Sequence, residues 1–389
     1  MAPIYLDHNA TTPVDPEVVE AMRPYLTDTY GNASSVHVFG REAKVALEEA
    51  RERIAEFIGC RGDELYFTSG GTESDNLAVL GTAFQMRDER NHIVVGAAEH
   101  HAVLEPAEYL HHDHGFELDL APVDSEGFVS PMRLRALLSD NTALVSIMHA
   151  NNEVGTVQDI ASLASRAHER GALFHTDAVQ STGKIDVNVR NMDVDLLSLT
   201  GHKIYGPKGT GALFIRRGVK IAPLFHGGSH EKRRRPGTEN VAGAVGLAKT
   251  LEIAGRRMGP DNSRLHELAD YFIDRALKEI PRSYFNGPRM GRIPQTINMS
   301  FPGAEGESLV LSLDLKGVAV SSGSACTSGA TEPSHVLKAM GVDALCGQGA
   351  LRFSLGRSTT REQLDYVLGV LPPVVERLRT VSAVSPNGD

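Results

Sequence analysis

The sequence predicts an α/β protein in which a sheet with crossover helices forms a large domain and a smaller α+β domain follows it. Two observations carry this prediction. From the N-terminus to about residue 250, short apolar runs rich in β-branched residues alternate with segments of helical period, which is the signature of strands joined by crossover helices. Beyond that point a helical stretch leads into Pro281 and then into a region rich in Ile, Val and Ser.

The predicted strands of the large domain are short, and most are followed by Gly or by polar turn residues. In open α/β sheets the binding crevice lies outside the carboxyl ends of the strands, so ligands are expected at these ends. The predicted strands are Leu65–Thr68, Ile93–Val95, Leu144–Met148, Leu173–Thr176, Leu196–Thr200 and Gly211–Ile215.

Apolar residues at helical spacing predict two helices. Arg41–Ile58 places charged residues between its apolar positions, and Gly59 follows as a stop. Ser263–Ile280 belongs to the C-terminal region, which also contains the strand-like segments Ile297–Phe301 and Val318–Ser321.

The chain is expected to divide into two domains. Residues 15–255 would form the large one, and residues 256–389 would form the small one together with residues 1–14, which pack on it. At 389 residues and 41 % hydrophobic content, the chain is long enough to bury substantial cores in two or three domains.

Composition and charge exclude several classes of function. The formal net charge of −10 argues against general nucleic-acid binding, which depends on many clustered Lys and Arg residues. No run of about 18 apolar residues occurs and the N-terminus is neither basic nor apolar, which argues against a membrane span or a secretory signal and favours a cytoplasmic location. The one basic run, Lys232–Arg235, is either a solvated loop or part of a subunit interface or docking surface.

The cysteines and the clustered histidines do not indicate a metal site. Cys60, Cys326 and Cys346 are odd in number and scattered, which fits neither a disulfide framework nor a zinc site. The three histidines within residues 111–114 lack metal-site spacing and are better explained by an exposed helix end. No metal is therefore expected in the chemistry of this chain.

The strongest chemical signal is Thr200-Gly201-His202-Lys203, which follows an apolar segment and precedes further glycines. A lysine at a strand end among small residues can reach inward while the backbone approaches a bulky phosphate-bearing ligand. A lysine taken at random is usually a surface cation, but this setting favours a desolvated amine suited to Schiff-base chemistry. Lys203 is therefore the candidate carrier of pyridoxal 5'-phosphate (PLP).

Two further elements end in groups that could hold such a ligand. Within Phe67–Asn76 a strand passes through glycines into a predicted helix, so Gly71 and Thr72 would either present N–H groups and a hydroxyl to an anion or simply start the helix. This is not a Walker motif, because the spaced Gly-Lys-Ser/Thr is missing. Asp177 stands just past another strand end, where its carboxylate could hold a pyridinium nitrogen protonated or could cap a helix.

These residues give the chain a resemblance to the fold-type I PLP enzymes of the class V aminotransferase group, and within it to the NifS/IscS-type cysteine desulfurases. The resemblance runs from Tyr5–Pro13 to Arg352–Arg357, nearly the whole chain, and includes Ser146–Gly155, the lysine element and Ser321–Ser328. It implies the PLP-dependent transferase fold of type I, with a mainly parallel seven-stranded sheet in the large domain, and it implies a homodimer.

The resemblance also implies roles for single residues. Lys203 would carry PLP as a Schiff base, and His100, otherwise readable as a structural histidine, would stack on the ring and act as an acid or base. Asp177 would pair with the pyridine nitrogen and Gln180 with the ring hydroxyl. The substrate carboxylate would be bound by Asn152 and Arg352. The remaining implied ligands of the cofactor and its phosphate are Gly71, Thr72, Asn152, Thr200, His202 and, from a second subunit, Thr238.

Cys326 distinguishes a desulfurase from its aminotransferase relatives. It lies in Ser321–Ala330, a segment so rich in small polar residues that a mobile surface loop is predicted. A mobile thiol could take sulfur inside the active site and present the persulfide outside. The expected reaction is PLP-dependent removal of sulfur from L-cysteine, giving L-alanine and a persulfide on Cys326. The sulfur would pass to an iron–sulfur scaffold protein, where Cys326 could contact a cluster during transfer, or to another acceptor.

Rival functions stay open at this point. A selenocysteine lyase or a class V aminotransferase would share Lys203, Asp177 and Arg352, and only the need for Cys326 separates them from a desulfurase. A non-catalytic sulfur-carrier platform with the same fold is a third possibility, against which the intact Lys203, Asp177 and Cys326 argue.

Overall fold

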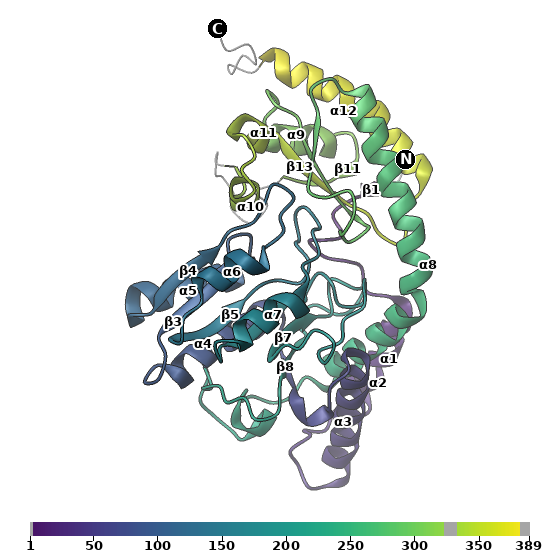
Figure 1. Ribbon diagram of the computed structural model, residues 1–389. Coiled ribbons are helices and arrows are strands. Elements are labelled where there is room, and N and C mark those ends of the chain that lie inside the picture. The colour runs from purple at the N-terminus through teal and green to yellow at the C-terminus, as the bar shows by residue number, and fades with distance from the viewer. Residues whose placement is uncertain (1–2, 323–332, 382–389) are drawn as a thin grey trace.

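The computed structural model describes residues 3–322 and 333–381. Cys326, with its predicted mobile loop, lies outside the described residues. In Figure 1 a large sheet covered by helices fills one half of the molecule, and a smaller sheet with α9 to α12 fills the other. The long helix α8 runs along the side of both halves.

The central sheet has seven strands in the order β2-β8-β7-β6-β5-β3-β4. Neighbouring strands are parallel from β7 to β4, whereas β8 runs antiparallel to both β7 and β2. This confirms the mainly parallel seven-stranded sheet. The strands are β2 (Leu65–Thr68), β3 (His92–Gly96), β4 (Glu117–Ala121), β5 (Thr142–Ser146), β6 (Leu173–Asp177), β7 (Leu196–Thr200) and β8 (Gly211–Ile215).

Within the central sheet, β4 is the strand that the sequence pattern did not predict. It lies at the edge of the sheet, and of its residues only Ala121 is fully buried. Because an edge strand exposes most of its side chains, β4 lacks the continuous apolar run that marks the central strands. The predicted strand Leu144–Met148 was also displaced, since β5 begins at Thr142 and ends at Ser146.

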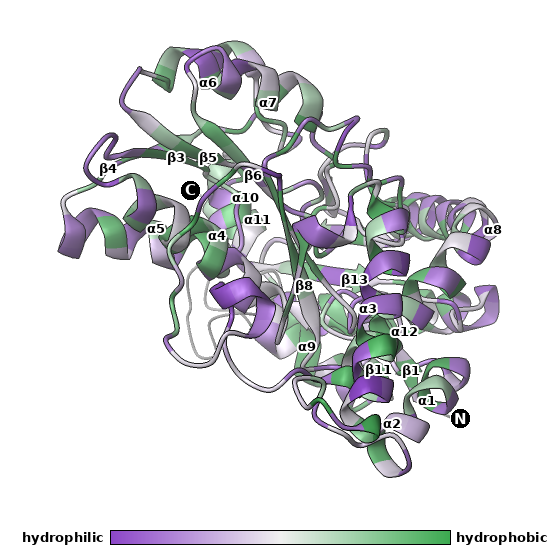
Figure 2. Cartoon of the chain, turned by 90° about the horizontal axis from the view of Figure 1, so that it is seen from below, coloured by the Kyte–Doolittle hydropathy of each residue, from purple (hydrophilic) through white to green (hydrophobic). Residues whose placement is uncertain are grey.

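Helices cover both faces of this sheet (Figures 1 and 2). On one face α4 (Gly71–Met86) and α5 (His101–His114) pack in the cluster that contains Leu77, Val103 and Leu110. On the other face α6 (Pro131–Leu137) and α7 (Ile160–His168) contribute to the main core. In Figure 2 strands β3, β5 and β8 are coloured mainly as hydrophobic, which agrees with their burial between two helical layers.

A second, antiparallel sheet has the order β12-β13-β10-β9. The N-terminal strand β1 (Ile4–Tyr5) pairs in parallel with β11 (Val318–Ala319), and Ile4 and Leu6 are buried in the same core as Phe301 and Phe353. The other elements here are β9 (Tyr284–Asn286), β10 (Thr296–Ser300), β12 (Ser321–Ser322), β13 (Ala350–Ser354), α9 (Gly306–Asp314), α10 (His335–Ala339), α11 (Ala344–Gln348) and α12 (Arg361–Val381).

The helices outside these two sheets include the predicted one at Arg41–Ile58. It is α3 (Val38–Ile58), and Gly59 ends it in the left-handed conformation with φ of 75°. The short helices α1 (Pro16–Met22) and α2 (Pro24–Thr27) precede it, and the 3-10 turns η1 (Gly62–Glu64) and η2 (His230–Arg233) lie in connections.

Helix α8 (Val241–Glu279) connects the two cores. Its first half buries Leu247 in the main core, and its second half buries Phe272 in the smaller core. The predicted helix Ser263–Ile280 was therefore too short at its start, where the Asn240 side chain caps the helix by accepting from the Gly243 N–H at 2.9 Å. The predicted domain boundary at residues 255 and 256 falls inside α8, and the division into domains stays a prediction.

The parallel strands bring distant segments of sequence to one edge of the sheet. Strands β3, β5, β6 and β7 all point the same way, so the segments that follow them leave at the same edge. His100, Asn152 and Lys203 lie in those segments, and Asp177 is the last residue of β6 itself rather than a residue past its end. Within residues 3–322 and 333–381 no helix is long and apolar enough to cross a membrane.

Candidate active site

Lys203 lies in the turn that follows β7, under the N-terminal segment. Its Nζ donates hydrogen bonds to the Asn9 carbonyl oxygen at 2.7 Å and the Ala10 carbonyl oxygen at 2.8 Å. The Gln180 Nε2 donates to the same Asn9 oxygen at 3.0 Å. The half-buried amine is thus held at the edge of the sheet, and the N-terminal residues form one wall of its site.

Asp177 is the last residue of β6, and it is buried. Its Oδ1 accepts a hydrogen bond from the Val179 N–H at 2.8 Å, so the carboxylate does brace the turn after the strand. Burial raises the pKa of Asp177 to about 6, against the opposing effects of that N–H and of the Lys203 charge. A cationic group placed against this carboxylate would be strongly favoured, because both groups lie out of water.

Two more buried acids surround Asp177, and sequence reasoning missed both. Asp75 is in the first turns of α4, and Glu99 precedes α5. Burial, together with the Asp177 charge, raises the pKa of each carboxyl well above its usual range. Glu99 accepts from the Met148 N–H at 2.7 Å. Asp75 and Glu99 are therefore favoured in their neutral, protonated forms, and Asp177 is the carboxyl of the three that most readily carries the negative charge.

His100 caps the N-terminus of α5 by accepting a hydrogen bond from the Ala102 N–H on its Nδ1, at 3.1 Å. An Nδ1 that accepts leaves the ring proton on Nε2. Burial lowers the pKa of His100 to about 4, and the Lys203 charge adds to the effect. His100 therefore presents a neutral ring with a donor Nε2–H at neutral pH, which suits stacking and proton donation. The role as a helix cap is thus shown, and the implied chemical role of His100 stays a prediction.

The residues implied for a phosphate group lie at or just after the ends of β2 and β7, two strands that β8 separates in the sheet. Gly71 and Thr72 form the first turn of α4, whose N-terminal N–H groups attract anions. A Cβ placed on Gly70 would lie 3.9 Å from the Thr200 Oγ1, so the end of β7 is next to this helix start. His202 follows directly, with its Nδ1 3.2 Å from the Thr11 Oγ1, and burial lowers its pKa to about 4.

Arg352 in β13 joins the second sheet to the loop after β5. Its Nη1 donates to the Asn152 carbonyl oxygen at 3.2 Å, and its Nη2 donates to the Asp7 Oδ1 at 2.9 Å. Its Nε is buried and has no hydrogen-bond partner among the described residues. A buried guanidinium with an unused N–H is suited to a carboxylate ligand, which accepts two parallel hydrogen bonds from one fork.

Glu153, beside Asn152, ties this loop to the chain that follows residues 323–332. Burial raises the pKa of Glu153 to about 7, and its carboxyl accepts a hydrogen bond from the Ser334 hydroxyl. His335 Nε2 lies 2.7 Å from the Glu99 carbonyl oxygen, next to His100. The described chain that resumes at residue 333 therefore begins beside two site loops.

The two described cysteines have unreactive settings. Burial raises the pKa of Cys60 to about 12, and burial also raises the pKa of Cys346. Since the thiolate is the nucleophile, neither thiol is prepared for attack. In the described part of the chain no group of His, Cys, Asp and Glu residues is arranged to hold a metal ion.

Comparisons with known proteins show the family of the chain. The aminotransferase class-V family model matches residues 4–367. A cysteine desulfurase IscS of Dictyoglomus turgidum is 54% identical over 379 residues, which are 97% of this chain and 96% of the relative. The chain belongs to the class-V aminotransferase family, in its cysteine desulfurase branch.

Solved structures of this family superpose closely on the chain. A NifS-like protein has a TM-score of 0.90 at 38% identity and covers 97% of this chain and 100% of its own. SspA in complex with cysteine has a TM-score of 0.78 at 33% identity, over 90% of this chain and 98% of its own. The fold of a type I desulfurase is thereby confirmed, while the roles of single residues stay predictions.

Thr238 is the candidate residue of this class-V enzyme that is implied to act in a second subunit. It is exposed in the turn before α8, so its implied role in a neighbouring subunit's site stays a prediction. The basic run Lys232–Arg235 lies just before it, where Arg235 Nε pairs with the Glu73 Oε1 of α4 at 2.8 Å. The run is therefore partly engaged within the chain near the start of α4.

Proposed function

We propose that this chain is a cysteine desulfurase that carries PLP on Lys203 and takes the sulfur of L-cysteine onto Cys326. The observation that carries the proposal is the convergence of Lys203, Asp177 and His100. The Lys203 charge acts on the pKa of both other groups, so a basic amine, a buried carboxylate and a neutral imidazole lie within electrostatic reach of one another.

The residues present fit PLP group by group. The Lys203 amine suits the aldehyde, Asp177 suits a protonated ring nitrogen and Gln180 suits the ring oxygen. The start of α4 together with Thr200 and His202 suits the phosphate. When bound, PLP supplies an electron sink that stabilises negative charge at the substrate α-carbon.

The protein groups then have definable tasks. A cationic ring nitrogen would lower the pKa of Asp177 from about 6, so that the carboxylate stays charged and keeps that nitrogen protonated. Lys203 would exchange its hydrogen bonds to the Asn9 and Ala10 carbonyls for the cofactor, and would move a proton at the substrate α-carbon once released. His100 would offer a flat neutral ring and a proton donor.

Arg352 and Asn152 would bind the substrate carboxylate. The Nε–H of Arg352, which no described residue accepts, and its η N–H groups form the planar fork that a carboxylate prefers. Because Arg352 is held by Asp7 and by the Asn152 carbonyl, the fork is oriented before substrate arrives.

Cys326 would receive the sulfur. It lies four positions after Ser322, the last described residue before it. In the transfer the Cys326 thiolate attacks the substrate sulfur, the carbon–sulfur bond breaks with its electron pair on carbon, and that carbon takes a proton. L-cysteine and a thiol thus give L-alanine and a persulfide, with no outside oxidant or reductant.

The cofactor assignment can be tested directly. The purified chain, supplied with PLP, should absorb visible light, and reduction with borohydride should fix a pyridoxyl group on Lys203 that peptide mass mapping locates. The Lys203→Ala variant should do neither. A colourless wild type without a modified Lys203 would instead support a non-catalytic sulfur-carrier platform.

The reaction assignment needs substrate comparisons. With a thiol reductant present, L-cysteine should give L-alanine and sulfide in equal amounts. Turnover of selenocysteine alone would indicate a selenocysteine lyase, and formation of the pyridoxamine form with keto acids would indicate an aminotransferase. We further propose a cytoplasmic homodimer that passes sulfur to an iron–sulfur scaffold or to another acceptor.

A further inference from the structure

Lys184 is a half-buried lysine that none of the roles above uses. Its Nζ donates a hydrogen bond to the Gln180 Oε1 at 2.8 Å. The other end of that amide, Nε2, donates to the Asn9 carbonyl oxygen at 3.0 Å, and Lys203 Nζ donates to the same oxygen at 2.7 Å. One chain of hydrogen bonds therefore links Lys184 to Lys203 through Gln180 and Asn9.

The neighbours of Gln180 determine which way its amide points. An ammonium group carries donors and no acceptor, so Lys184 must face the amide oxygen. A backbone carbonyl only accepts, so the Asn9 oxygen must face the amide N–H groups. Both neighbours select the same orientation, in which the donor end of Gln180 lies beside Lys203.

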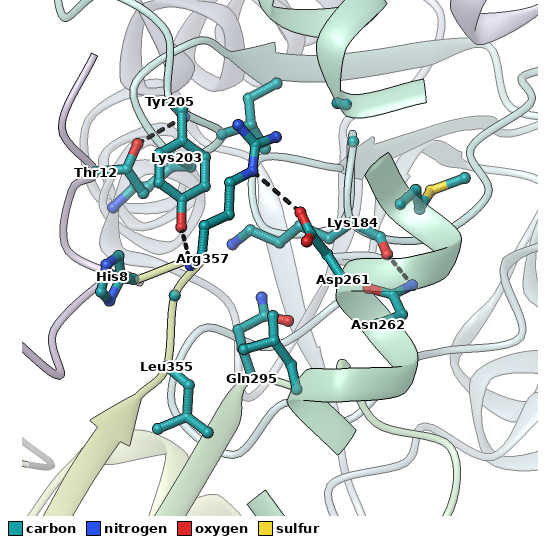
Figure 3. Close-up of a pocket in the computed structure, with 16 residues that line it drawn as sticks. His8, Thr12, Lys184, Lys203, Tyr205, Asp261, Asn262, Gln295, Leu355 and Arg357 are labelled. Carbon is teal, nitrogen blue, oxygen red and sulfur yellow. Dashed lines mark hydrogen bonds and ion pairs between the residues drawn. The ribbon is translucent and has the colours of Figure 1, made fainter. Parts of the chain in front are cut away.

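Lys184 and Lys203 line the same small cavity of about 50 Å³, together with Asp261 (Figure 3). Burial lowers the pKa of Lys184 to about 7, and the charges of Lys203 and Arg352 act in the same direction. A negative charge near Lys184 would raise that pKa again and favour the ammonium form. The charged and titratable groups around Lys184 are Lys203, Arg352, His8 and His202 and, in the same cavity, Tyr205, Asp261 and Arg357. Asp261 is paired with the Arg357 Nε at 3.1 Å.

We propose that Lys184 is a positioning residue that makes the Gln180 amide donate to the ring oxygen of PLP and places a positive charge behind that oxygen. The inference rests on the proposed function, because it requires PLP on Lys203. The amide can turn its Nε2–H from the Asn9 oxygen to the ring oxygen while its Oε1 stays on Lys184. Without Lys184 the amide could flip and present its oxygen to the negative ring oxygen.

Loss of Lys184 should change the acidity of the nitrogen that links Lys203 to PLP. The protonated nitrogen is positive, so a nearby ammonium disfavours it and removal of that ammonium raises its pKa. A ring oxygen that has lost its donor is also more stable beside a protonated nitrogen, which raises the pKa again. The two effects have the same sign, and together they predict a shift of about one pH unit upward.

The test uses the PLP-loaded enzyme and its visible absorption as a function of pH. In Lys184→Met the midpoint of the spectral transition should rise by about one unit, and PLP should bind about tenfold more weakly. Lys184→Arg keeps the charge and the donors, so it should stay near the wild type. Lys316→Met, which removes an exposed lysine near α9, is the matched control and should change neither quantity.

A double mutant separates positioning from a general structural role. If Lys184 acts through the amide, the part of the spectral shift that comes from the lost ring-oxygen donor should vanish when Lys184→Met is made in a Gln180→Ala background, and only the direct effect of the charge should remain. An unchanged midpoint in Lys184→Met, or an undiminished shift in the double mutant, would overturn the inference. Circular dichroism checks folding, and Lys184→Gln replaces Lys184→Met if the latter does not fold. A wild type with no PLP absorption would remove the proposed function and this inference with it.

Discussion

Replacement of Arg352 by lysine should weaken the binding of L-cysteine and leave the fold in place. The Arg352 side chain is 5% exposed, and two of its three nitrogens are already oriented, by Asp7 and by the Asn152 carbonyl. A carboxylate can take the free Nε–H and an η N–H at once. Lysine keeps the charge but offers a compact ammonium without the planar fork.

The size of the effect follows from the hydrogen bond that is lost. A hydrogen bond to a charged group contributes about 1.5–3 kcal/mol, and about 1.4 kcal/mol corresponds to tenfold in an equilibrium constant. KM for L-cysteine should therefore rise about 10- to 150-fold in Arg352→Lys. The turnover number should change far less, because the carboxylate is held in the same way before and during the reaction.

The assay is the rate of alanine formation against L-cysteine concentration, at matched PLP content. Arg292→Lys is a suitable control, because the Arg292 side chain is also fully buried and pairs with Asp270 at 2.8 Å outside the candidate site. It should lower the melting temperature without raising KM. An unchanged KM in Arg352→Lys, or an equal rise in both variants, would refute the reasoning.

Three further predictions concern pH, assembly and stability. Burial raises the pKa of Glu153 from 4.5 to about 7, so the folded apoprotein holds a proton that the unfolded chain releases, and its free energy of unfolding should fall as pH rises between these values. In urea titrations the free energy of unfolding of Glu153→Gln should depend less on pH than that of the wild type, by up to about 3 kcal/mol over this range. An equally flat dependence in the wild type would contradict this. Mixed dimers of one Thr238→Val subunit and one Lys203→Ala subunit should be more active than either mutant homodimer, because one of their two sites then combines an intact Lys203 with an intact Thr238 from the other subunit. Mixed dimers no more active than the homodimers would contradict a shared site. Gly115→Ala should cost about 1 kcal/mol for its left-handed backbone, and Gly59→Ala should cost more, because its new Cβ would also clash with the Asn188 side chain. If chemical denaturation gave the same loss of unfolding free energy for both variants, the steric argument for Gly59 would be contradicted.

The central strands could be predicted from the sequence because burial on both faces leaves a continuous apolar run, as in β7. The same reasoning failed at β4, whose edge position exposes most of its residues. It also failed at the start of α8, because that half of the helix was assigned to no element although Leu247 and Leu251 are spaced for burial. Edge strands and helices shared between two cores depend on tertiary contacts that local patterns do not record.

The candidate site divides in the same way. Lys203 and Asp177 could be found because each stands at a strand end in a distinctive local setting. Asp75, Glu99 and Lys184 could not, because their importance arises from burial and from partners distant in sequence. An acidic or basic side chain is usually solvated, so its sequence neighbours give no sign that it is buried beside a catalytic group.

The central claim is that sulfur leaves L-cysteine for Cys326, and one mass measurement tests it. The PLP-loaded enzyme is mixed with L-cysteine without reductant, and both the peptide that contains Cys326 and the alanine released are quantified. We expect that peptide to gain the mass of one sulfur atom in step with one alanine per site, and Cys326→Ala to keep its PLP absorption but give neither product. Alanine and sulfide formed at the wild-type rate by Cys326→Ala would contradict the account.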